Sequence, residues 1–416
     1  MPPGLPDIVS GPRPGGERTR SCAGFTVDAR TLGLYVHWPF CRSKCPYCDF
    51  NSHVETAIDQ RRWRAALVAE IRHFAALTPG RRLQTVFFGG GTPSLMPPET
   101  VAAVIETARA CWETADDIEI TLEANPTSVE AARLSAYRAA GVGRLSLGVQ
   151  SLEADGLAAL GREHGVDEAI EAIAAAHALF DRVSFDLIYA RPGQTRPGWR
   201  RELERALEHA GTHLSVYQLT IEPGTVFHGL HRRGELVLPP EDEQAGFFED
   251  TRSMLADAGL PGYEISNHAR PGDECRHNLI YWLSADYAGV GPGAHGRITR
   301  DGRTANFVQR RAPEAWRAAV EAAGHATVSE TVLEPSERLE EIAMMGLRLA
   351  DGIPRTRFEA LTGGQPEALF DPVALERLSA GGFLELDGRG LRATPAGRLR
   401  LDAVLGALLA PTAASR

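Results

Sequence analysis

The stretch YVHWPFCRSKCPYCDF, residues 35–50, decides how the rest of this chain is interpreted. It begins as an apolar run typical of a buried strand. It then places Cys41, Cys45 and Cys48 at the spacing C-x-x-x-C-x-x-C. Three thiolates at this spacing can bind three corners of a four-iron cluster and leave the fourth iron open to a ligand that the chain does not encode. The sequence therefore indicates a reactive iron–sulfur site directly after a strand.

A structural zinc site is the alternative. Zinc prefers four protein ligands, so Asp49 or His53 would have to complete the set. Zinc sites built from C-x-x-C pairs usually come as two halves, and this chain has one. The remaining cysteines, Cys22, Cys111 and Cys275, are too scattered in 416 residues to form a disulfide scaffold. We therefore favour the iron–sulfur cluster, and we expect Cys111, on the apolar stripe of a helix, to be a core residue.

The composition is that of a globular protein with a sizeable core. Hydrophobic residues make up 43% of the chain, and 44 Lys and Arg against 54 Asp and Glu give a net charge of −10. This acidic balance predicts no nucleic-acid partner. No apolar run reaches the length of a membrane span, and the first residues lack the apolar segment of a secretory signal. We expect a cytoplasmic protein whose residues 1–30, rich in Pro, Gly and Arg, form a disordered tail.

Short apolar strands alternate with helical patterns over residues 31–230, which predicts a parallel α/β sheet. Periodicity alone does not distinguish a partial barrel from an open sheet. In both architectures the chemistry lies at the carboxyl ends of the strands, and the polar motifs GGGTPS, EANP and GVQS follow strands here. The predicted strands cover residues 32–38, 84–90, 117–124, 143–150, 182–189 and 213–220.

Beyond residue 230 the pattern changes. Residues 231–325 are predicted to be an irregular connecting region, because the aromatic and Gly-rich segment 262–296 shows little regular period. Residues 326–416 are predicted to form a mainly helical, winged-helix-like domain with a small hairpin at LELDGRGLRAT. In an acidic chain we expect this module to pack against the first domain and not to bind DNA.

The cysteine motif, with Tyr47 just before its last cysteine, resembles the radical S-adenosylmethionine superfamily. This resemblance implies a partial (β/α)6 barrel and a [4Fe-4S] cluster on Cys41, Cys45 and Cys48. It implies that the open iron chelates S-adenosylmethionine, which the reduced cluster cleaves to a 5′-deoxyadenosyl radical. Carried over residue by residue, the family's positions for this cofactor are Tyr35, Tyr47, Gly90, Gly91, Thr92, Glu123, Gln150, Arg162, Asp186 and, with least weight, Thr220.

Within that superfamily the chain resembles the HemN/HemW branch, which contains oxygen-independent coproporphyrinogen III oxidases and the haem chaperones similar to them. The oxidases have a further cysteine where this chain has Phe50, whereas the chaperones share CPYCDFNSH. The chaperones also carry H-N-x-x-Y-W, a motif associated with haem binding, and HNLIYW matches it with His277, Asn278, Tyr281 and Trp282. An imidazole can ligate haem iron and aromatic rings can pack on a porphyrin.

Three interpretations follow. The favoured one, by resemblance to HemW, is a haem chaperone that delivers haem to acceptor proteins such as respiratory cytochromes. The others are a coproporphyrinogen III oxidase, which is a radical oxidative decarboxylase, and a zinc-stabilised structural protein. The first interpretation predicts haem, haem acceptors and an electron donor for the cluster as partners, and it leaves a peripheral membrane contact open. Cys275 is either a second haem ligand or a plain thiol, and whether the chain is an enzyme stays open.

Overall fold

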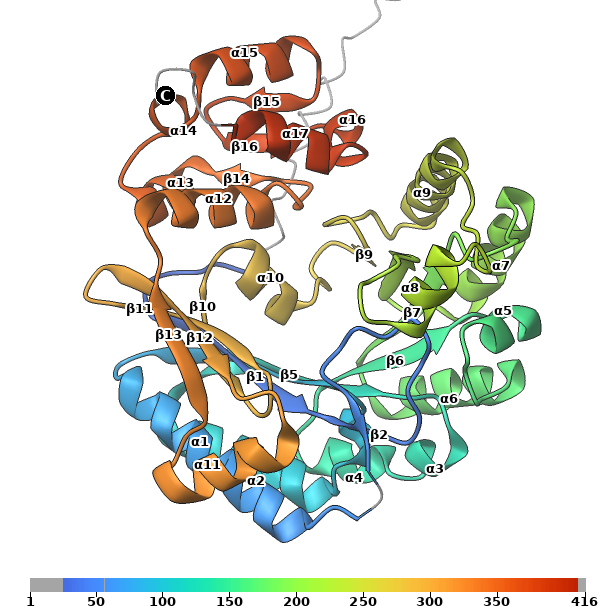
Figure 1. Ribbon diagram of the computed structural model, residues 1–416, viewed down its shortest axis with the longest axis vertical. Helices are drawn as coiled ribbons and strands as arrows, with labels where there is room; N and C mark the ends of the chain where they lie inside the picture. Colours follow the sequence, from blue (N-terminus) through green and yellow to red (C-terminus); the bar gives the residue numbers. More distant parts are fainter. Residues whose placement is uncertain (1–24, 56, 411–416) are drawn as a thin grey trace, which may run out of the picture.

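The computed structural model describes residues 25–55 and 57–410, so Cys22 and most of the expected tail lie outside the described residues. A mixed sheet in the order β13-β12-β11-β10-β1-β4-β5-β6-β7-β8-β9 curves around an interior space (Figure 1). Its central strands are mutually parallel and confirm the six predicted strands. Their bounds are β1 Thr31–Trp38, β4 Arg82–Gly90, β5 Glu113–Ala124, β6 Arg144–Gln150, β7 Arg182–Tyr189 and β8 His213–Gln218. The partial barrel is thus confirmed.

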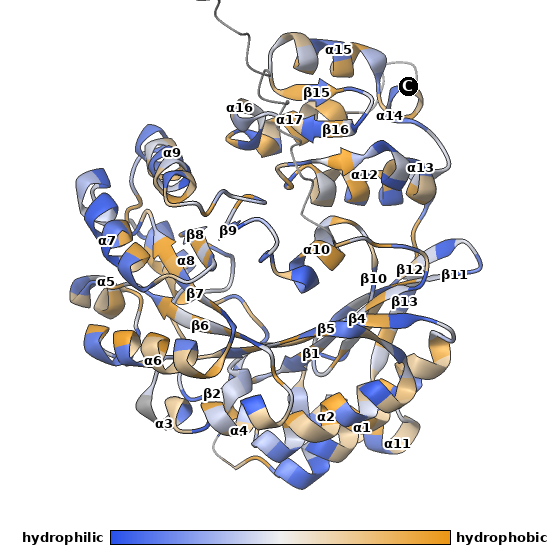
Figure 2. Ribbon diagram, turned by 180° about the vertical axis from the view of Figure 1, so that it is seen from behind, coloured by the Kyte–Doolittle hydropathy of each residue, from blue (hydrophilic) through white to orange (hydrophobic). Residues whose placement is uncertain are grey.

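Helices cover the outer side of this sheet because each has one apolar stripe. In α1 (Gln60–Leu77) the side chains of Trp63, Leu67 and Phe74 are buried, and the N-cap Asp59 accepts a hydrogen bond from a backbone N–H of the first turn. Figure 2 shows the same division of hydrophobic and hydrophilic residues on the outer helices. The other helices of this layer are α2 Pro98–Cys111, α5 Ala154–Ala159, α6 Val166–Leu179 and α7 Arg196–His209. In the described ranges no helix is long and apolar enough to cross a bilayer.

Between β5 and β6 the chain forms two short helices. The structure has α3 Ser128–Ala131 and α4 Leu134–Ala139, and Gly141 then takes a φ of 106°, which favours glycine. The first of them follows Thr127, whose hydroxyl accepts a hydrogen bond from the Glu130 backbone N–H at 3.4 Å. Cys111 is half-buried and packs against the main core, as expected.

Residues 231–325 are not irregular, and this prediction is wrong. They contain β10, which pairs in parallel with β1, and a meander that extends the sheet beyond it. The strand β10 is only five residues long and contains Gly289, so its period is hidden, and its partner strand lies about 250 residues earlier in the chain. The bounds are α8 Val226–Arg232, α9 Glu241–Asp257, β9 Asn267–Ala269, α10 Arg276–Trp282, β10 Asp286–Val290, β11 His295–Arg300, β12 Arg303–Gln309, α11 Pro313–Ala323 and β13 Thr327–Val332.

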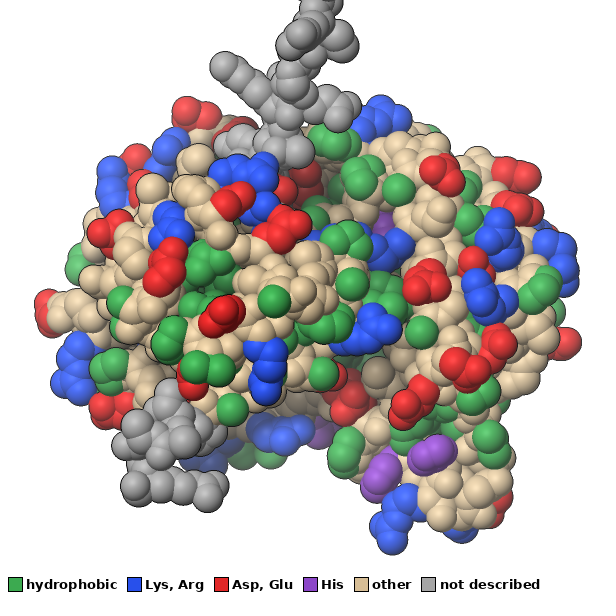
Figure 3. All heavy atoms as spheres, turned by 90° about the horizontal axis from the view of Figure 1, so that it is seen from above, with side chains coloured by type: hydrophobic (Ala, Val, Ile, Leu, Met, Phe, Trp, Pro, Cys, Tyr) green, Lys and Arg blue, Asp and Glu red, His purple; other side chains and the backbone are tan. Residues whose placement is uncertain are grey.

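A second core lies in a C-terminal module that sits above the open side of the barrel (Figure 1). Its three-stranded sheet has the order β14-β16-β15, and the predicted hairpin is the antiparallel pair β15 and β16, which confirms the winged-helix-like pattern. Figure 3 views the molecule from above and shows acidic and basic side chains interspersed on this face. The bounds are α12 Pro335–Gly346, β14 Ile353–Pro354, α13 Arg355–Thr362, α14 Pro366–Leu369, α15 Pro372–Ala380, β15 Leu384–Leu386, β16 Gly390–Ala393, α16 Pro395–Arg398 and α17 Leu401–Leu408.

Candidate functional site

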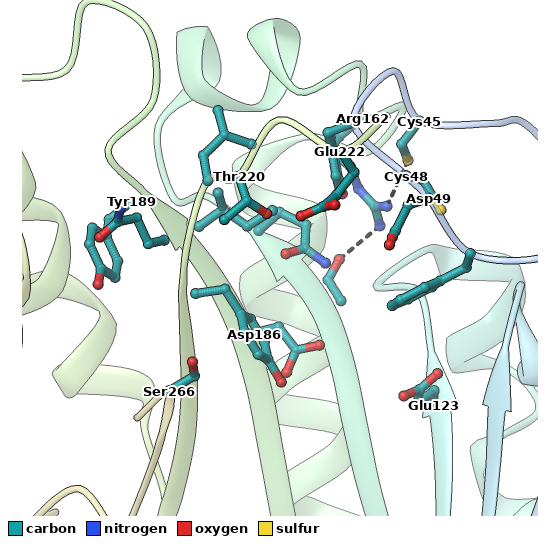
Figure 4. A pocket seen from close by; sticks show the side chains of 18 of the residues that line it. Cys45, Cys48, Asp49, Glu123, Arg162, Asp186, Tyr189, Thr220, Glu222 and Ser266 are labelled. Carbon is teal, nitrogen blue, oxygen red and sulfur yellow. Dashed lines mark hydrogen bonds between the residues drawn. The ribbon is translucent and has the colours of Figure 1, made fainter. Parts of the chain in front are cut away.

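A pocket of about 1280 Å³ lies at the carboxyl ends of the parallel strands, and we call it the central pocket (Figure 4). Parallel strands end at one edge, so the side chains that follow them converge there. Residues 398–403 of the C-terminal module line the pocket from the opposite side. The central pocket is therefore bounded by both parts of the chain.

The cysteine loop forms one wall of this pocket. The strand β2 (Phe40–Cys41) pairs in parallel with β3 (His53–Val54), so a short ribbon closes the base of the loop. The backbone N–H of Cys48 donates to the Cys45 carbonyl at 3.2 Å and turns the chain between these two thiols. Cys41, Cys45 and Cys48 all line the central pocket.

Cys41 and Cys45 each have a polar neighbour that suits a thiolate. The Thr92 hydroxyl donates to Cys41 Sγ at 3.4 Å, and Arg162 Nη1 donates to Cys45 Sγ at 3.3 Å. Burial raises the pKa of Cys41 and of Cys48, so binding of iron has to displace protons from these thiols. Three sulfur donors on one pocket wall, with hydrogen-bond donors behind them, fit the ligand set of an iron–sulfur cluster.

The proposed fourth ligands for zinc occupy different places. Asp49 lines the central pocket, but His53 does not, and its Nε2 atom lies 3.2 Å from Asn51 Oδ1 on the exposed side of the loop. Across the described residues, no group of three or more His, Cys, Asp or Glu side chains is arranged to hold a single metal ion.

The glycine-rich turn after β4 packs directly on the base of the cysteine loop. The N–H groups of Gly91 and Thr92 donate to backbone carbonyls of Trp38 and Phe40 at 2.7 and 2.9 Å. A Cβ atom on Gly91 would come within 2.8 Å of the Phe40 carbonyl oxygen, and one on Gly90 would meet the His37 ring at 2.7 Å. Only glycine allows this close approach, which opens the backbone toward the pocket.

Arg162 joins three parts of the pocket. Besides its bond to Cys45 (Figure 4), its Nη2 atom donates to Asn125 Oδ1 at 2.6 Å and to the Gly148 carbonyl at 2.7 Å. These bonds tie the cysteine loop to the ends of β5 and β6, which gives Arg162 a fixed place beside the thiols.

Two half-buried carboxyl groups, Glu123 and Asp186, lie on the pocket floor. Burial, with a smaller contribution from Asp186, raises the pKa of Glu123 to about 8. Burial also raises the pKa of Asp186 to about 6, against the hydrogen bond that it accepts from Ser146 at 3.4 Å. A cationic ligand would stabilise the charged form of both groups, and perturbed carboxyls of this kind mark functional pockets.

The structure brings together nine of the ten residues expected to contact S-adenosylmethionine. Gln150 ends β6 with a φ of 72°, a left-handed conformation that is uncommon outside glycine. Tyr35 is the exception, because it points into a neighbouring pocket and lies 3.1 Å from His37 Nδ1 through its hydroxyl. The nine that line the central pocket are Tyr47, Gly90, Gly91, Thr92, Glu123, Gln150, Arg162, Asp186 and Thr220.

The four residues of the HNLIYW motif lie on α10 but do not surround one cavity. His277 is 1% exposed, and its ring nitrogens are both bonded, Nδ1 to the Thr85 hydroxyl and Nε2 to the Tyr281 hydroxyl, each at 2.7 Å. The ring also stacks on Phe87, with centroids 5.0 Å apart. In this arrangement neither nitrogen of His277 is available to a ligand.

The other motif residues face different neighbours. Asn278 Nδ2 donates to the Tyr263 hydroxyl at 3.4 Å, and the guanidinium of Arg348 lies 4.6 Å from the Trp282 ring. Arg348 in turn lines the central pocket, whereas Tyr281 lines the neighbouring one. Cys275 is buried, and its Sγ atom donates to Glu119 Oε1 at 3.6 Å. This environment is that of a plain thiol.

Sequence reasoning missed several residues of the site. Asn125 follows Glu123 by two positions and accepts a hydrogen bond from Arg162, but the motif EANP predicts no role for it. His37 and His295 line the neighbouring pocket without having been singled out. The signal for His295 was present in GPGAHG, a histidine beside glycines that follow a strand.

Comparison with known proteins agrees with this geometry. Residues 35–206 match the family model of the Radical SAM superfamily, and residues 333–400 match the HemN C-terminal domain. The mitochondrial radical S-adenosyl methionine domain-containing protein 1 of Mus musculus is 41% identical over 90% of this chain and 87% of its own length. The heme chaperone HemW of Escherichia coli is 38% identical over 92% of this chain and 100% of its own.

A solved structure supports the fold. Coproporphyrinogen III oxidase (HemN) from Escherichia coli superimposes with a TM-score of 0.75, over 91% of this chain and 90% of that one, at 24% identity. The sequence relatives carry the family assignment, since they extend over nearly the whole chain. The chain therefore belongs to the radical S-adenosylmethionine superfamily and, within it, to the HemN/HemW branch that includes the haem chaperones.

Proposed function

We propose that this chain is a haem chaperone of the HemW kind, with a [4Fe-4S] cluster and S-adenosylmethionine in the central pocket, and that it passes haem to acceptor proteins such as respiratory cytochromes. The observation that carries the proposal is the convergence of three thiols and nine expected cofactor residues on one pocket. The relative named heme chaperone HemW, which aligns with 92% of this chain, supports the choice within the branch.

In this proposal the residues of the pocket have distinct tasks. Cys41, Cys45 and Cys48 hold the cluster, and Arg162 and Thr92 donate to the sulfurs. When bound, the cluster would supply the electron for cleavage of S-adenosylmethionine. A separate donor protein would first reduce the cluster. The other expected residues bind and orient the cofactor. We place the protein in a reducing compartment such as the cytoplasm, and the Mus musculus relative is named mitochondrial.

The proposed haem site lies against α10, where the haem-associated motif is found. Tyr281 presents its ring to the neighbouring pocket, and His277 holds the Tyr281 hydroxyl from behind. The Trp282 ring packs against Arg348, and Asn278 donates a hydrogen bond to Tyr263. These contacts connect α10 with the rest of the fold. The motif would then shape one wall of the haem site.

A coproporphyrinogen oxidase is the second candidate, because the fold matches that of HemN over nine-tenths of both chains. Against it stands Phe50, where the oxidases carry a further cysteine. Phe50 is 59% exposed and lines both pockets, so an apolar ring borders the cofactor at this position.

The cluster is tested by anaerobic reconstitution with iron and sulfide. The chain should take up about four irons, and Cys41→Ser, Cys45→Ser and Cys48→Ser should each abolish the cluster absorption. Cys111→Ser is the matched control, since Cys111 packs on the main core outside the pocket. Zinc uptake in place of iron would contradict both candidate functions.

Haem binding and turnover separate the two candidates. The reconstituted chain should bind haem in a titration and should not convert coproporphyrinogen III to protoporphyrinogen IX at enzymatic rates. Transfer is tested by mixing haem-loaded protein with an apocytochrome and following the acceptor spectrum. Rapid turnover without haem binding would favour the oxidase.

A further inference from the structure

A second pocket, which we call the side pocket, adjoins the central pocket. It has a volume of about 410 Å³ and lies beside β1 and β10 at their carboxyl ends. Phe50, Gly90 and Glu123 line both pockets, so the two spaces meet at the cysteine loop. A ligand in the side pocket would therefore lie next to the cofactor site.

His295 lines this pocket, and its ring is not hydrogen-bonded to any of the described residues. It begins β11 directly after the GPGA turn, and its residue is exposed. The other histidine of the side pocket, His37, has its Nδ1 atom bonded to the Tyr35 hydroxyl at 3.1 Å and its Nε2 atom to the Asn51 carbonyl at 3.0 Å. His277 is likewise doubly bonded and buried. Of these three imidazoles, His295 has nitrogens to offer a metal.

Four aromatic side chains line the same pocket as His295. The side pocket is lined by Tyr35, Phe50, Tyr281 and Tyr287, and the Tyr281 and Tyr287 rings pack edge to face with centroids 4.6 Å apart. A planar apolar macrocycle is well matched by such rings. The side pocket thus pairs an iron-ligating group with walls suited to a porphyrin.

The positively charged side chain of Arg311 lies at the same pocket. It is exposed and forms no ion pair within the described part of the chain. Asn51 fixes this arrangement, because its Nδ2 atom donates to the carbonyls of Pro292 and Arg311, each at 2.9 Å. The backbone on both sides of His295 is thereby held to the cysteine loop, and the guanidinium is available to a carboxylate.

We propose that the side pocket is the haem site, with His295 as the axial ligand of the iron and Arg311 as the partner of a propionate. This inference rests on the proposed function and replaces His277 as the iron ligand with a residue outside the HNLIYW motif. His277 is a positioning residue that holds Tyr281 against the porphyrin face. A single axial ligand at an exposed position also suits a carrier, since an acceptor can reach the bound haem.

The test uses the full, anaerobically reconstituted chain titrated with ferric haem and followed by difference absorption and by electron paramagnetic resonance of the haem iron. His295→Ala should shift the Soret band, remove the spectrum of the imidazole-ligated iron and weaken haem binding roughly tenfold or more. Added imidazole should restore the spectrum. His177→Ala is the matched control, an exposed histidine at the end of the outer helix α6.

The outcomes are distinct. Loss of the imidazole spectrum in His295→Ala, its return with imidazole, and an unchanged His177→Ala would support the assignment. An unchanged spectrum and affinity in His295→Ala would overturn it while leaving the proposed function in place. Failure of the unaltered chain to bind haem would overturn the proposed function and this inference together.

Discussion

A buried carboxylate, Glu202 on α7, holds the backbone that presents Gln150 to the central pocket. Its Oε1 atom accepts from the Ser151 hydroxyl at 2.5 Å and from the Leu152 backbone N–H at 3.0 Å. The guanidinium of Arg191 donates to both carboxylate oxygens at 3.1 and 2.5 Å. Because the side chains of Glu202 and Arg191 are only 1% and 6% exposed, solvent cannot replace these bonds.

Replacing Glu202 with Ala should destabilise the barrel and weaken cofactor binding together. Removing one partner of a buried ion pair costs about 3–5 kcal/mol, because the remaining charge is uncompensated. Part of this is offset by about 1–2 kcal/mol if Gln150 relaxes from its left-handed conformation. The expected net loss in free energy of unfolding is therefore about 1–4 kcal/mol. Since Gln150 then loses its defined place, affinity for S-adenosylmethionine should fall roughly tenfold.

Urea unfolding measures the stability change, and calorimetric titration of cluster-loaded protein with S-adenosylmethionine measures the affinity. Glu204→Ala is the control, because Glu204 lies on the same helix and is exposed. A loss below about 1 kcal/mol, the range of ordinary surface substitutions, together with unchanged affinity would refute the reasoning.

Three further predictions follow from the same contacts. Gly91→Ala should abolish binding of S-adenosylmethionine in a titration, because the new methyl group would lie within 2.8 Å of a backbone oxygen of the cysteine loop; full binding would contradict the close approach. Burial raises the pKa of Glu123 to about 8, and the stability from a carboxyl with a raised pKa is lost as pH rises through that value. The melting temperature should therefore fall between about pH 5 and pH 8. Glu123→Gln should flatten this fall, whereas identical pH profiles would argue against a raised pKa at Glu123. Glu70→Gln should lower the free energy of unfolding by about 2–4 kcal/mol in a urea titration, since an amide nitrogen would face N–H donors. Those donors include the N–H of Gly291, at 2.8 Å, which begins the GPGA turn before His295. Glu70→Gln should therefore also disturb haem binding at the side pocket. Glu106→Gln, on an exposed face of α2, is the control.

Local sequence pattern was enough to predict the elements whose structure depends on neighbouring residues. Six strands were found from apolar runs bounded by turn residues, because burial of both faces leaves a continuous apolar signal. The cysteine loop was found because its three ligands lie within eight residues, and the glycine-rich turn because only glycine tolerates its close contacts. Since parallel strands end at one edge, the order of strands and polar motifs along the chain is enough to predict where the central pocket lies.

Tertiary structure alone decided what depends on partners distant in the chain. The pairing of β10 with β1 turned an apparently irregular region into part of the sheet. The HNLIYW motif made His277 an expected haem ligand. The packing of α10 between β4 and the C-terminal module buries His277, and both of its ring nitrogens are hydrogen-bonded to neighbouring side chains. His295 was left free because the β11 turn places it at a pocket edge. A side chain's availability is set by the neighbours that surround it, and these neighbours come from segments that no local pattern connects.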